Sequence, residues 1–281
     1  MHIIEHIREM QIWSEDERRQ GKRIVLVPTM GFLHEGHLSL VREGRKRGDR
    51  LIVSIFVNPK QFAPDEDYAA YPRNLERDRG LLKKEGVDVL FHPSADEVYA
   101  EGHETHVEVE RMGSILCGAF RPGHFRGVST VVAKLFNIVR PHVAIFGLKD
   151  YQQLQIIRRM AVDLNFDVEV VGYPIVRERD GLAMSSRNAY LGKRERQAAL
   201  CLYRALKKAE SLVLEGQRSG ERIIGAVRAE LEKESLARVE YVCLCHPATL
   251  EQVEEIHDEA LLALAVWIGK ARLIDNVLLR A

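Results

Sequence analysis

Through about the first 170 residues, short continuous apolar runs alternate with longer stretches of helical periodicity. Apolar runs of this length predict strands, and runs without polar alternation are typical of a sheet covered on both faces. The expected strands are Ile24–Val27, Leu51–Val57, Val87–Phe91, Val143–Phe146 and Val168–Val171. The expected helices between them are Gly36–Arg47, Asn74–Lys84, Val128–Val139 and Asp150–Leu164. This alternation predicts an α/β fold with a doubly wound parallel sheet.

The pattern changes after about residue 175. Two amphipathic stretches there predict helices, and three apolar runs predict strands, the last two joined by a turn that contains a glycine. These elements are expected over Lys193–Leu214, Glu221–Glu234, Val239–Leu244, Leu261–Ile268 and Ala271–Val277. We therefore expect a larger domain over residues 1–175 and a smaller α+β domain over residues 176–281.

The composition, with 46% apolar and 29% charged residues, is that of a soluble globular protein. Lys plus Arg and Asp plus Glu number 41 each, so a large basic surface for nucleic acid is not expected. The N-terminus lacks the long apolar core of a secretory signal, and the run Ala260–Ile268 is too short to span a membrane. We therefore expect a cytoplasmic protein without a membrane or nucleic-acid partner.

Two segments have the residue pattern of phosphate-binding loops. In the first, Pro28–His37, an apolar strand ends in a glycine-containing turn and opens a helix, whose first amides have no partner within the helix. His34 and His37 lie at this helix start and can donate hydrogen bonds to phosphate oxygens. In the second, Met184–Asn188, two serines add hydroxyls and Arg187 can neutralise charge that develops on pyrophosphate. Together they predict an enzyme that handles the phosphates of a nucleotide.

Further polar residues follow strands, and ligands of doubly wound sheets bind beyond the carboxyl ends of the strands. Lys149 can contact a phosphate, and Gly147 before it allows close approach of the backbone to a ligand. Asp150 is expected to cap the next helix. Asn58 and Gln61 carry amides that suit a substrate with hydroxyl and carboxylate groups, although Asn58 could equally end its strand.

Several other polar residues fit structural roles. Ser129 and Thr130 are expected to be helix caps rather than nucleophiles, and His124 is expected to brace the site. The segment Arg177–Gly181 has the composition of a flexible, solvated loop and would suit a mobile lid.

The cysteines and the remaining histidines give little support for a metal site. Cys243–His246 resembles a metal-binding fragment, but its alternation fits a strand with both thiols on one face better. The segment His103–Glu110 also alternates and predicts a short strand. Its His103 and His106 are three residues apart, which is not the spacing of a zinc-binding HExxH helix.

Six motifs occur in the order found in one known family. They are PTMG-x-LH-x-GH, FVNP-x-QF, YPR, RPGHF-x-GV-x-TVV, FG-x-KDYQQL and DGLAMSSRN. Through them the chain closely resembles the pantoate–β-alanine ligase (pantothenate synthetase) family over essentially its full length, including Ile268–Asn276. The resemblance implies a Rossmann-like first domain, a homodimer and a two-step ligation. Pantoate attacks the α-phosphorus of ATP to give pantoyl adenylate and pyrophosphate, and the amine of β-alanine then displaces AMP to give pantothenate.

The resemblance also implies roles for individual residues. His37 would donate a proton, Lys149 would contact phosphate, and Gln61 would contact both pantoate and β-alanine. The implied catalytic residues are His34, His37, Lys149 and Arg187. The implied ATP-binding residues are Met30, Gly31, His34, His37, Gly147, Leu148, Lys149, Asp150, Val176, Met184, Ser185, Ser186 and Arg187. The implied residues for pantoate and β-alanine are Gln61, Gln153, Asn58 and Met30. Mg²⁺ is expected to bridge the phosphates; its protein ligands stay unassigned, with Asp78 as a candidate for the outer shell.

The chain departs from the family at two places. It has Leu116-Cys117-Gly118 where the family usually has Leu-Glu-Gly, and it is less acidic near Cys243–His246. These changes bear on packing, dimer contacts or rate rather than on reaction class. Two other functions stay open. The loops also resemble those of nucleotidylyltransferases, whose product keeps the nucleotide, and a non-catalytic nucleotide-binding module would need the same phosphate contacts.

Overall fold

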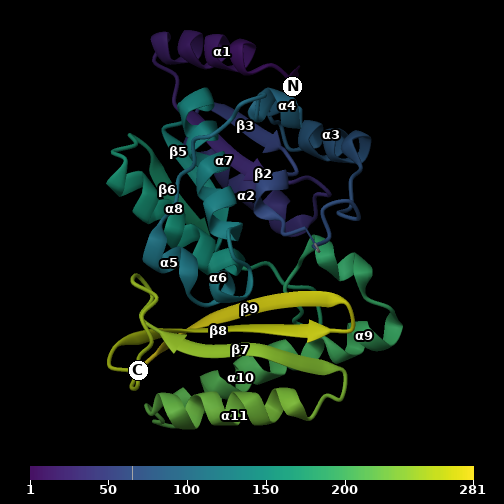
Figure 1. The fold of residues 1–281 in the computed structure, drawn as a ribbon, viewed down its shortest axis with the longest axis vertical. Coiled ribbons are helices and arrows are strands. Elements are labelled where there is room, and N and C mark those ends of the chain that lie inside the picture. Colours follow the sequence, from purple (N-terminus) through teal and green to yellow (C-terminus); the bar gives the residue numbers. More distant parts are fainter. Residues whose placement is uncertain (65) are drawn as a thin grey trace. The chain divides into compact units, whose positions relative to one another are not determined.

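A computed structural model describes residues 1–64 and 66–281, which form two compact units (Figure 1). The first unit comprises Met1–Leu148 and Gln153–Pro174. The second comprises Lys149–Gln152 and Ile175–Ala281. The short segment Lys149–Gln152 thus clusters with the C-terminal residues, although its position in the sequence suggested the first domain.

The first unit contains a six-stranded sheet in the order β1-β4-β3-β2-β5-β6, and all of its strand pairs are parallel. The strands are β1 (His2–Ile4), β2 (Ile24–Thr29), β3 (Arg50–Ile55), β4 (Val89–Phe91), β5 (Val143–Gly147) and β6 (Glu169–Tyr173). The doubly wound α/β prediction is confirmed, and five of the strands had been expected. Strand β1 was missed because its three residues are too few to show a pattern.

Helices connect these strands. They are α1 (Ile7–Arg19), α2 (Glu35–Arg47), α3 (Leu75–Lys84), α4 (Ala95–Val98), α5 (Glu110–Ser114), α6 (Cys117–Phe120), α7 (His124–Val139) and α8 (Tyr151–Asp163). Helix α1 was not predicted; its buried residues are Met10 and Ser14. Helix α2 packs against β2, β3 and β5 and buries Leu40 and Val41 in an apolar core with Val27.

The capping role expected for Ser129 and Thr130 is wrong. Helix α7 begins earlier, after Gly123, which has a left-handed φ of 80°. Thr130 lies inside the helix, where its hydroxyl donates to the carbonyl of Arg126 and accepts from the backbone N–H of Val107. Both residues are buried, so they belong to the packing of α7 rather than to its end.

The short strand expected over His103–Glu110 is also wrong, because this stretch has no regular structure before α5 begins at Glu110. The backbone of Val107 is bonded to the side chain of Thr130 rather than to a neighbouring strand. The His103 ring packs edge-on against Tyr99, with centroids 5.0 Å apart. No group of three potential metal-ligating side chains occurs in the described part of the chain.

The register of the sheet identifies where a ligand would bind. Strand β2 pairs with β3 along its whole length, from Ile24–Arg50 to Thr29–Ile55. Its pairing with β5, on the other side, comprises Val25–Val143 and Leu26–Ala144 and stops before β2 ends. The strand order reverses between β2 and β5, and such a switch point is the usual ligand position in open α/β sheets. The loop after β2 and the end of β5 are therefore the first places to examine.

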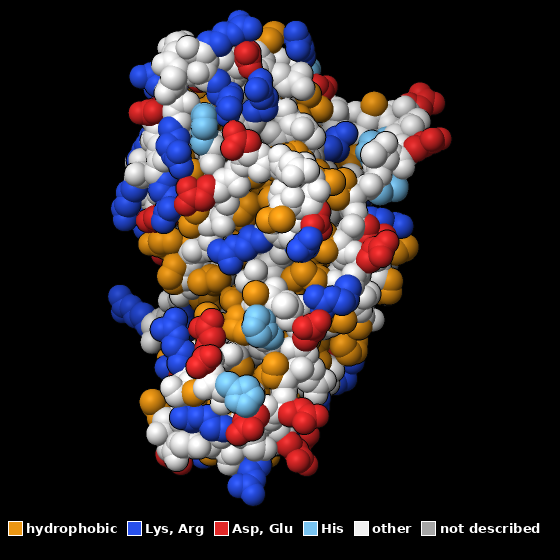
Figure 2. Space-filling model, turned by 90° about the vertical axis from the view of Figure 1, so that its left-hand side faces the viewer, with side chains coloured by type: hydrophobic (Ala, Val, Ile, Leu, Met, Phe, Trp, Pro, Cys, Tyr) orange, Lys and Arg blue, Asp and Glu red, His pale blue; other side chains and the backbone are white. Residues whose placement is uncertain are grey.

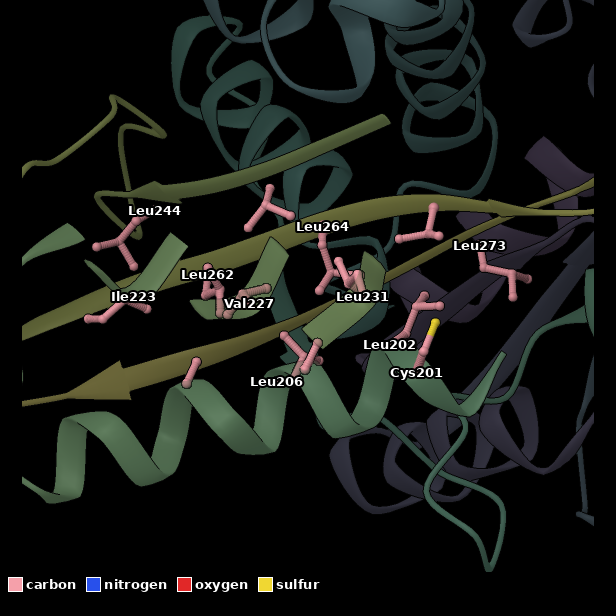
Figure 3. Packing of buried hydrophobic residues seen from close by; sticks show 14 of the residues in the cluster. Cys201, Leu202, Leu206, Ile223, Val227, Leu231, Leu244, Leu262, Leu264 and Leu273 are labelled. Carbon is pink, nitrogen blue, oxygen red and sulfur yellow. The ribbon is translucent and has the colours of Figure 1, made fainter. Parts of the chain in front are cut away.

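The second unit is a three-stranded antiparallel sheet with helices packed on one face. Its strands are β7 (Ala237–Cys245), β8 (Glu259–Ile268) and β9 (Ala271–Arg280), and its helices are α9 (Lys193–Ala198), α10 (Leu200–Leu214) and α11 (Gly220–Glu232). Figure 3 shows Leu202 and Leu206 of α10 facing Leu262 and Leu264 of β8 in an apolar core. The single helix expected over Lys193–Leu214 is interrupted at Ala199. Cys243 and Cys245 lie in β7, as their alternation predicted.

We expect Cys201, in the core of the second unit, not to react with thiol reagents in the native protein. Burial raises the pKa of the Cys201 thiol to about 11. Because the thiolate is the reactive form and the raised pKa keeps the thiol protonated, labelling at about pH 8 should be no faster than unfolding. Peptide mapping by mass spectrometry, with and without denaturant, measures this. Rapid labelling of Cys201 under native conditions contradicts the expectation.

Basic and acidic side chains are intermixed on the face shown in Figure 2, in line with their equal numbers in the sequence. Among residues 1–64 and 66–281, no helix has both the length and the apolar character that a membrane crossing requires.

Candidate active site

The loop that leaves β2 has a tightly specified backbone. The Thr29 hydroxyl donates to the carbonyl of Ser54 (2.8 Å) and accepts from the N–H of Gly31 (3.2 Å). Gly31 has a left-handed φ of 82°, and a Cβ added there would lie 2.9 Å from a methyl of Ile55. A side chain at this position would be strained and would also clash, so the turn requires glycine.

His34 and His37 form a linked pair at the start of α2. His34 is the N-cap, and its Nδ1 accepts from the N–H of Gly36 (3.1 Å). The N–H of His34 in turn donates to Nδ1 of His37 (3.3 Å), and the two ring centroids are 4.1 Å apart. Because each Nδ1 accepts a backbone N–H, the neutral rings carry their hydrogen on Nε2. Both histidines are thereby set up as donors through Nε2, which is the geometry that a phosphate oxygen needs.

Gln61 and Met30 lie together in the first unit. The Gln61 side-chain amide nitrogen is 3.3 Å from the Met30 sulfur, and its oxygen accepts from the amide of Asn58 (3.0 Å). Asn58 also donates to the carbonyl of Gly127 and accepts from the hydroxyl of Tyr99 (2.8 Å). With an exposure of 1% and these internal bonds, the Asn58 side chain is fixed against Gln61. These contacts favour a bracing role for Asn58, and its role as a substrate ligand stays a prediction.

The backbone of Gln61 is fixed as well. Its carbonyl lies 2.8 Å from Nδ1 of His124 and accepts from Arg121 (3.3 Å). Arg121 makes a two-pronged ion pair with Glu66 (2.6 and 2.7 Å). His124 is thus a structural residue, as the sequence suggested, and the RPGHF segment acts by holding Gln61.

The end of β5 carries Gly147, and a 3₁₀ turn over Leu148–Asp150 follows it. The Lys149 ammonium lies 3.9 Å from the carboxylate of Asp150. The carbonyl of Lys149 accepts from the side chain of Asn276 in β9 (2.9 Å), which fixes the lysine backbone within the second unit. Asp150 is the last residue of this 3₁₀ turn and directly precedes α8, which begins at Tyr151, so its expected capping role stays a prediction.

The serine-rich loop has its own internal order. The N–H of Met184 donates to the carbonyl of Val176 (3.0 Å), and the Ser185 hydroxyl accepts from the N–H of Arg187 (3.2 Å) at the start of a 3₁₀ turn, Ser186–Tyr190. A cavity of about 10 Å³ within the second unit is lined by Lys149, Leu182, Ala183, Ser185, Asn188, Leu202, Leu273, Ile274 and Asp275. The second unit thus brings Lys149 and Ser185 together, two residues 36 positions apart in the sequence.

The segment Arg177–Gly181, expected to be a flexible and solvated loop, is exposed at Arg179 and Asp180 but is held by ion pairs. Arg177 makes a bidentate ion pair with Asp275 of β9 (2.6 and 2.9 Å), whose side chain is 1% exposed. Arg196 of α9 pairs with both Glu178 (2.7 Å) and Asp180 (2.8 Å). Charged residues usually indicate a solvated loop, but here they are paired with one another and anchor the segment to the domain.

Asp78 does not suit the metal role for which it was a candidate. Its carboxylate is buried and accepts the backbone N–H groups of Phe32 (2.7 Å) and Leu33 (2.9 Å). Magnesium prefers carboxylates that are open to it and to its waters. Its two carboxylate oxygens are engaged by these backbone donors, so Asp78 is not offered to a metal ion here.

The site residues predicted from sequence divide between the units. The first unit holds Met30, Gly31, His34, His37, Asn58, Gln61, Gly147, Leu148 and Gln153; the second holds Lys149, Asp150, Val176, Met184, Ser185, Ser186 and Arg187. Sequence reasoning missed the supporting roles of Asp78, Arg177, Asp275 and Asn276, although it had named Asp78 as a metal candidate and Arg177 as part of a lid. Asp275 and Asn276 had one available signal, because a charged residue and an amide interrupt an otherwise apolar strand.

Comparison with known proteins shows which family the chain belongs to. A model of the family "Pantoate-beta-alanine ligase" matches residues 2–278. A pantothenate synthetase of Geobacter sulfurreducens is 57% identical over 279 residues, which cover 99% of each chain. The crystal structure of pantothenate synthetase from Thermus thermophilus has a TM-score of 0.94 at 45% identity and covers 99% of both chains. A pantoate-β-alanine ligase from Francisella tularensis, solved with β,γ-ATP and β-alanine, has a TM-score of 0.82 at 34% identity and covers 99% of this chain and 97% of its own. The chain therefore belongs to the pantoate–β-alanine ligase family of enzymes.

Proposed function

We propose that the protein condenses (R)-pantoate with β-alanine to pantothenate, using ATP and releasing AMP and pyrophosphate. The observation that carries the proposal is the histidine pair at the start of α2, in which backbone N–H groups occupy both Nδ1 atoms and leave Nε2 as the donor. The Francisella relative, described as a complex with a form of ATP and β-alanine, supports the same substrates here.

In the first step, a pantoate carboxylate oxygen attacks the α-phosphorus and the bond to pyrophosphate breaks. Negative charge moves onto the leaving group, so fixed donors around the phosphates stabilise the transition state. His34 and His37 act through Nε2–H, which donates hydrogen bonds to the phosphate oxygens where this charge develops. Lys149 and Arg187 would supply positive charge to the phosphates.

In the second step, the amine of β-alanine attacks the acyl carbon and AMP leaves. For the first step, the residues that would hold pantoate are Gln61, Gln153 and Met30. Their neutral side chains orient the acid without neutralising the carboxylate that must attack. Gln61 suits this task since Asn58 fixes the orientation of its amide. Holding three reactants in order contributes a large proximity effect.

The remaining residues would complete the nucleotide site. Lys149 is flanked by Gly147, Leu148 and Asp150. In the serine-rich loop, the N–H of Met184 donates to the carbonyl of Val176 and so joins the two residues. Ser185 and Ser186 would add hydroxyl contacts to the phosphates. In this proposal residues 1–175 form the ATP- and pantoate-binding domain, and residues 176–281 form a lid.

We propose Mg²⁺ as part of the MgATP substrate, held by the phosphates rather than by a protein cage. We further propose a homodimer that works in the cytoplasm, as the family resemblance implies. None of the steps above depends on a metal ligand from the chain.

The purified protein should release AMP and pyrophosphate only when pantoate and β-alanine are both supplied with MgATP. Chromatography of the nucleotides with mass spectrometry of the product measures this. ADP as the product contradicts adenylation. A product that retains AMP favours a nucleotidylyltransferase, and ATP binding without turnover for this substrate pair favours a binding module.

A further inference from the structure

The loop before the histidine pair contains an unusual backbone conformation. Phe32 has φ of 48° and follows Gly31, whose φ is 82°, so two successive residues are left-handed. Glycine adopts this conformation freely, but a residue with a bulky side chain rarely does. A strained residue persists where its surroundings hold it, and such residues concentrate at functional sites.

The group that holds Phe32 is the carboxylate of Asp78, in the first turn of α3. One carboxylate oxygen accepts the N–H of Phe32 (2.7 Å) and the other accepts the N–H of Leu33 (2.9 Å). Successive N–H groups that converge on one anion form a nest, and left-handed residues are what turn them to the same side. Leu33 is fully buried and Asp78 is 1% exposed, so water could not easily replace these bonds.

The same turn of α3 also contacts the Phe32 side chain. The Arg77 guanidinium lies 5.4 Å from the centre of the Phe32 ring. Burial raises the pKa of Asp78, whereas the two amide bonds act in the opposite direction. The fold therefore keeps a buried carboxylate at this position even though charging it is unfavourable.

The nest lies directly before the catalytic pair. His34 follows Leu33 without a spacer, and the N–H of His34 is the donor that sets the His37 ring through Nδ1. If Asp78 no longer bound the N–H groups of Phe32 and Leu33, the backbone that carries the His34 N–H would lose its fixed orientation.

We propose that Asp78 is a positioning residue, which holds Phe32 in its left-handed conformation and thereby fixes the orientation and tautomer of His34 and His37. Its effect on turnover rests on the proposed function. Its effect on the histidine rings does not, because that effect exists without substrate.

The first test compares Asp78→Asn with Glu76→Gln, an exposed residue in the same turn of α3. Asp78→Asn is nearly isosteric but turns an NH₂ group toward a backbone N–H. We expect it to lower kcat by about tenfold or more, with a smaller change in KM for β-alanine, while Glu76→Gln behaves as the parent. Adding Phe32→Gly, which removes the strain, should recover much of the lost turnover. A lower Tm with unchanged kcat, or no recovery in the double variant, overturns the proposal.

A second series works even if Asp78→Asn does not fold. Phe32→Asn places a residue that tolerates left-handed backbone, whereas Phe32→Val places a β-branched residue that does not. We expect kcat to stay higher in the asparagine variant than in the valine variant by about tenfold. Equal kcat values in the two variants overturn the strain argument.

A third measurement separates this proposal from the proposed function. Nitrogen NMR of the imidazoles, without substrate, should show His34 and His37 of the parent protein as Nε2–H tautomers. That signature should be lost in Phe32→Val and kept in Phe32→Asn. If the tautomer signature changes in this way in a protein that makes no pantothenate, the proposed function is wrong and the positioning role stands. If the signature is unchanged in Phe32→Val, the positioning role is wrong.

Discussion

Lys149→Ala is expected to lower kcat by about 10² to 10³-fold while leaving the fold intact. The ammonium is a fixed positive charge for the phosphates, and its loss removes stabilisation that develops as pyrophosphate leaves. The fold should survive because the Lys149 ammonium contacts Asp150 only loosely, at 3.9 Å, and the bond from Asn276 goes to the Lys149 backbone. Steady-state kinetics and Tm measure the two effects separately.

Two further variants sharpen this prediction. Lys149→Arg keeps the charge but spreads it over a planar group, so we expect turnover between those of the parent and the alanine variant. Lys270→Ala removes an exposed lysine from a turn of the same unit and should change neither kcat nor Tm. Near-normal turnover in Lys149→Ala would remove this lysine from the mechanism.

Asp275→Ala is expected to lower the free energy of unfolding by about 3 kcal/mol, at the lower end of the range for broken buried ion pairs because Arg177 keeps some solvent contact. The variant leaves the Arg177 guanidinium without its bidentate partner and removes the acceptor for the N–H of Asn276. It should also raise KM for ATP, since Arg177 anchors the segment that leads to the serine loop. Denaturant titration and steady-state kinetics measure these changes.

The double variant Arg177→Met/Asp275→Leu tests the cause. Replacing both charges by apolar side chains leaves no unpaired charge, so most of the lost stability should return. Asp163→Ala, which breaks an exposed pair with Arg159 in α8, should change stability little. If the double variant is as unstable as Asp275→Ala, the loss comes from packing or from Asn276 rather than from the unpaired guanidinium.

The elements of the sheet were readable from sequence because their signals are local. Strand β2 is a run of apolar residues that is buried on both faces, and it shows as such without any knowledge of its neighbours. Asn74 precedes α3 and its side chain caps the N–H of Arg77, so that helix began where the sequence indicated. Errors arose where the partner was distant: Thr130 binds Val107 and Arg126 instead of capping a helix.

The candidate site divides in the same way. The residue types that suit phosphate and a carboxylic acid, such as His37, Lys149 and Gln61, stood out from their motifs. Their supports did not, because Asp78 and Asp275 look like ordinary charged residues until their partners 45 and 98 positions away are known. Asn58 was ambiguous for the same reason, since only its contacts with Gln61 and Tyr99 show that its amide is already used.

The sequence by itself determined the α/β class, the order of the main strands and helices, and the loops that carry the chemistry. Periodicity and motifs are properties of residues close together in the sequence, so they can be recognised without knowledge of the tertiary structure. The tertiary structure alone decided which polar groups hold others in place. That choice depends on burial and on hydrogen bonds between residues far apart in the chain, as in the convergence of the Phe32 and Leu33 amides on Asp78.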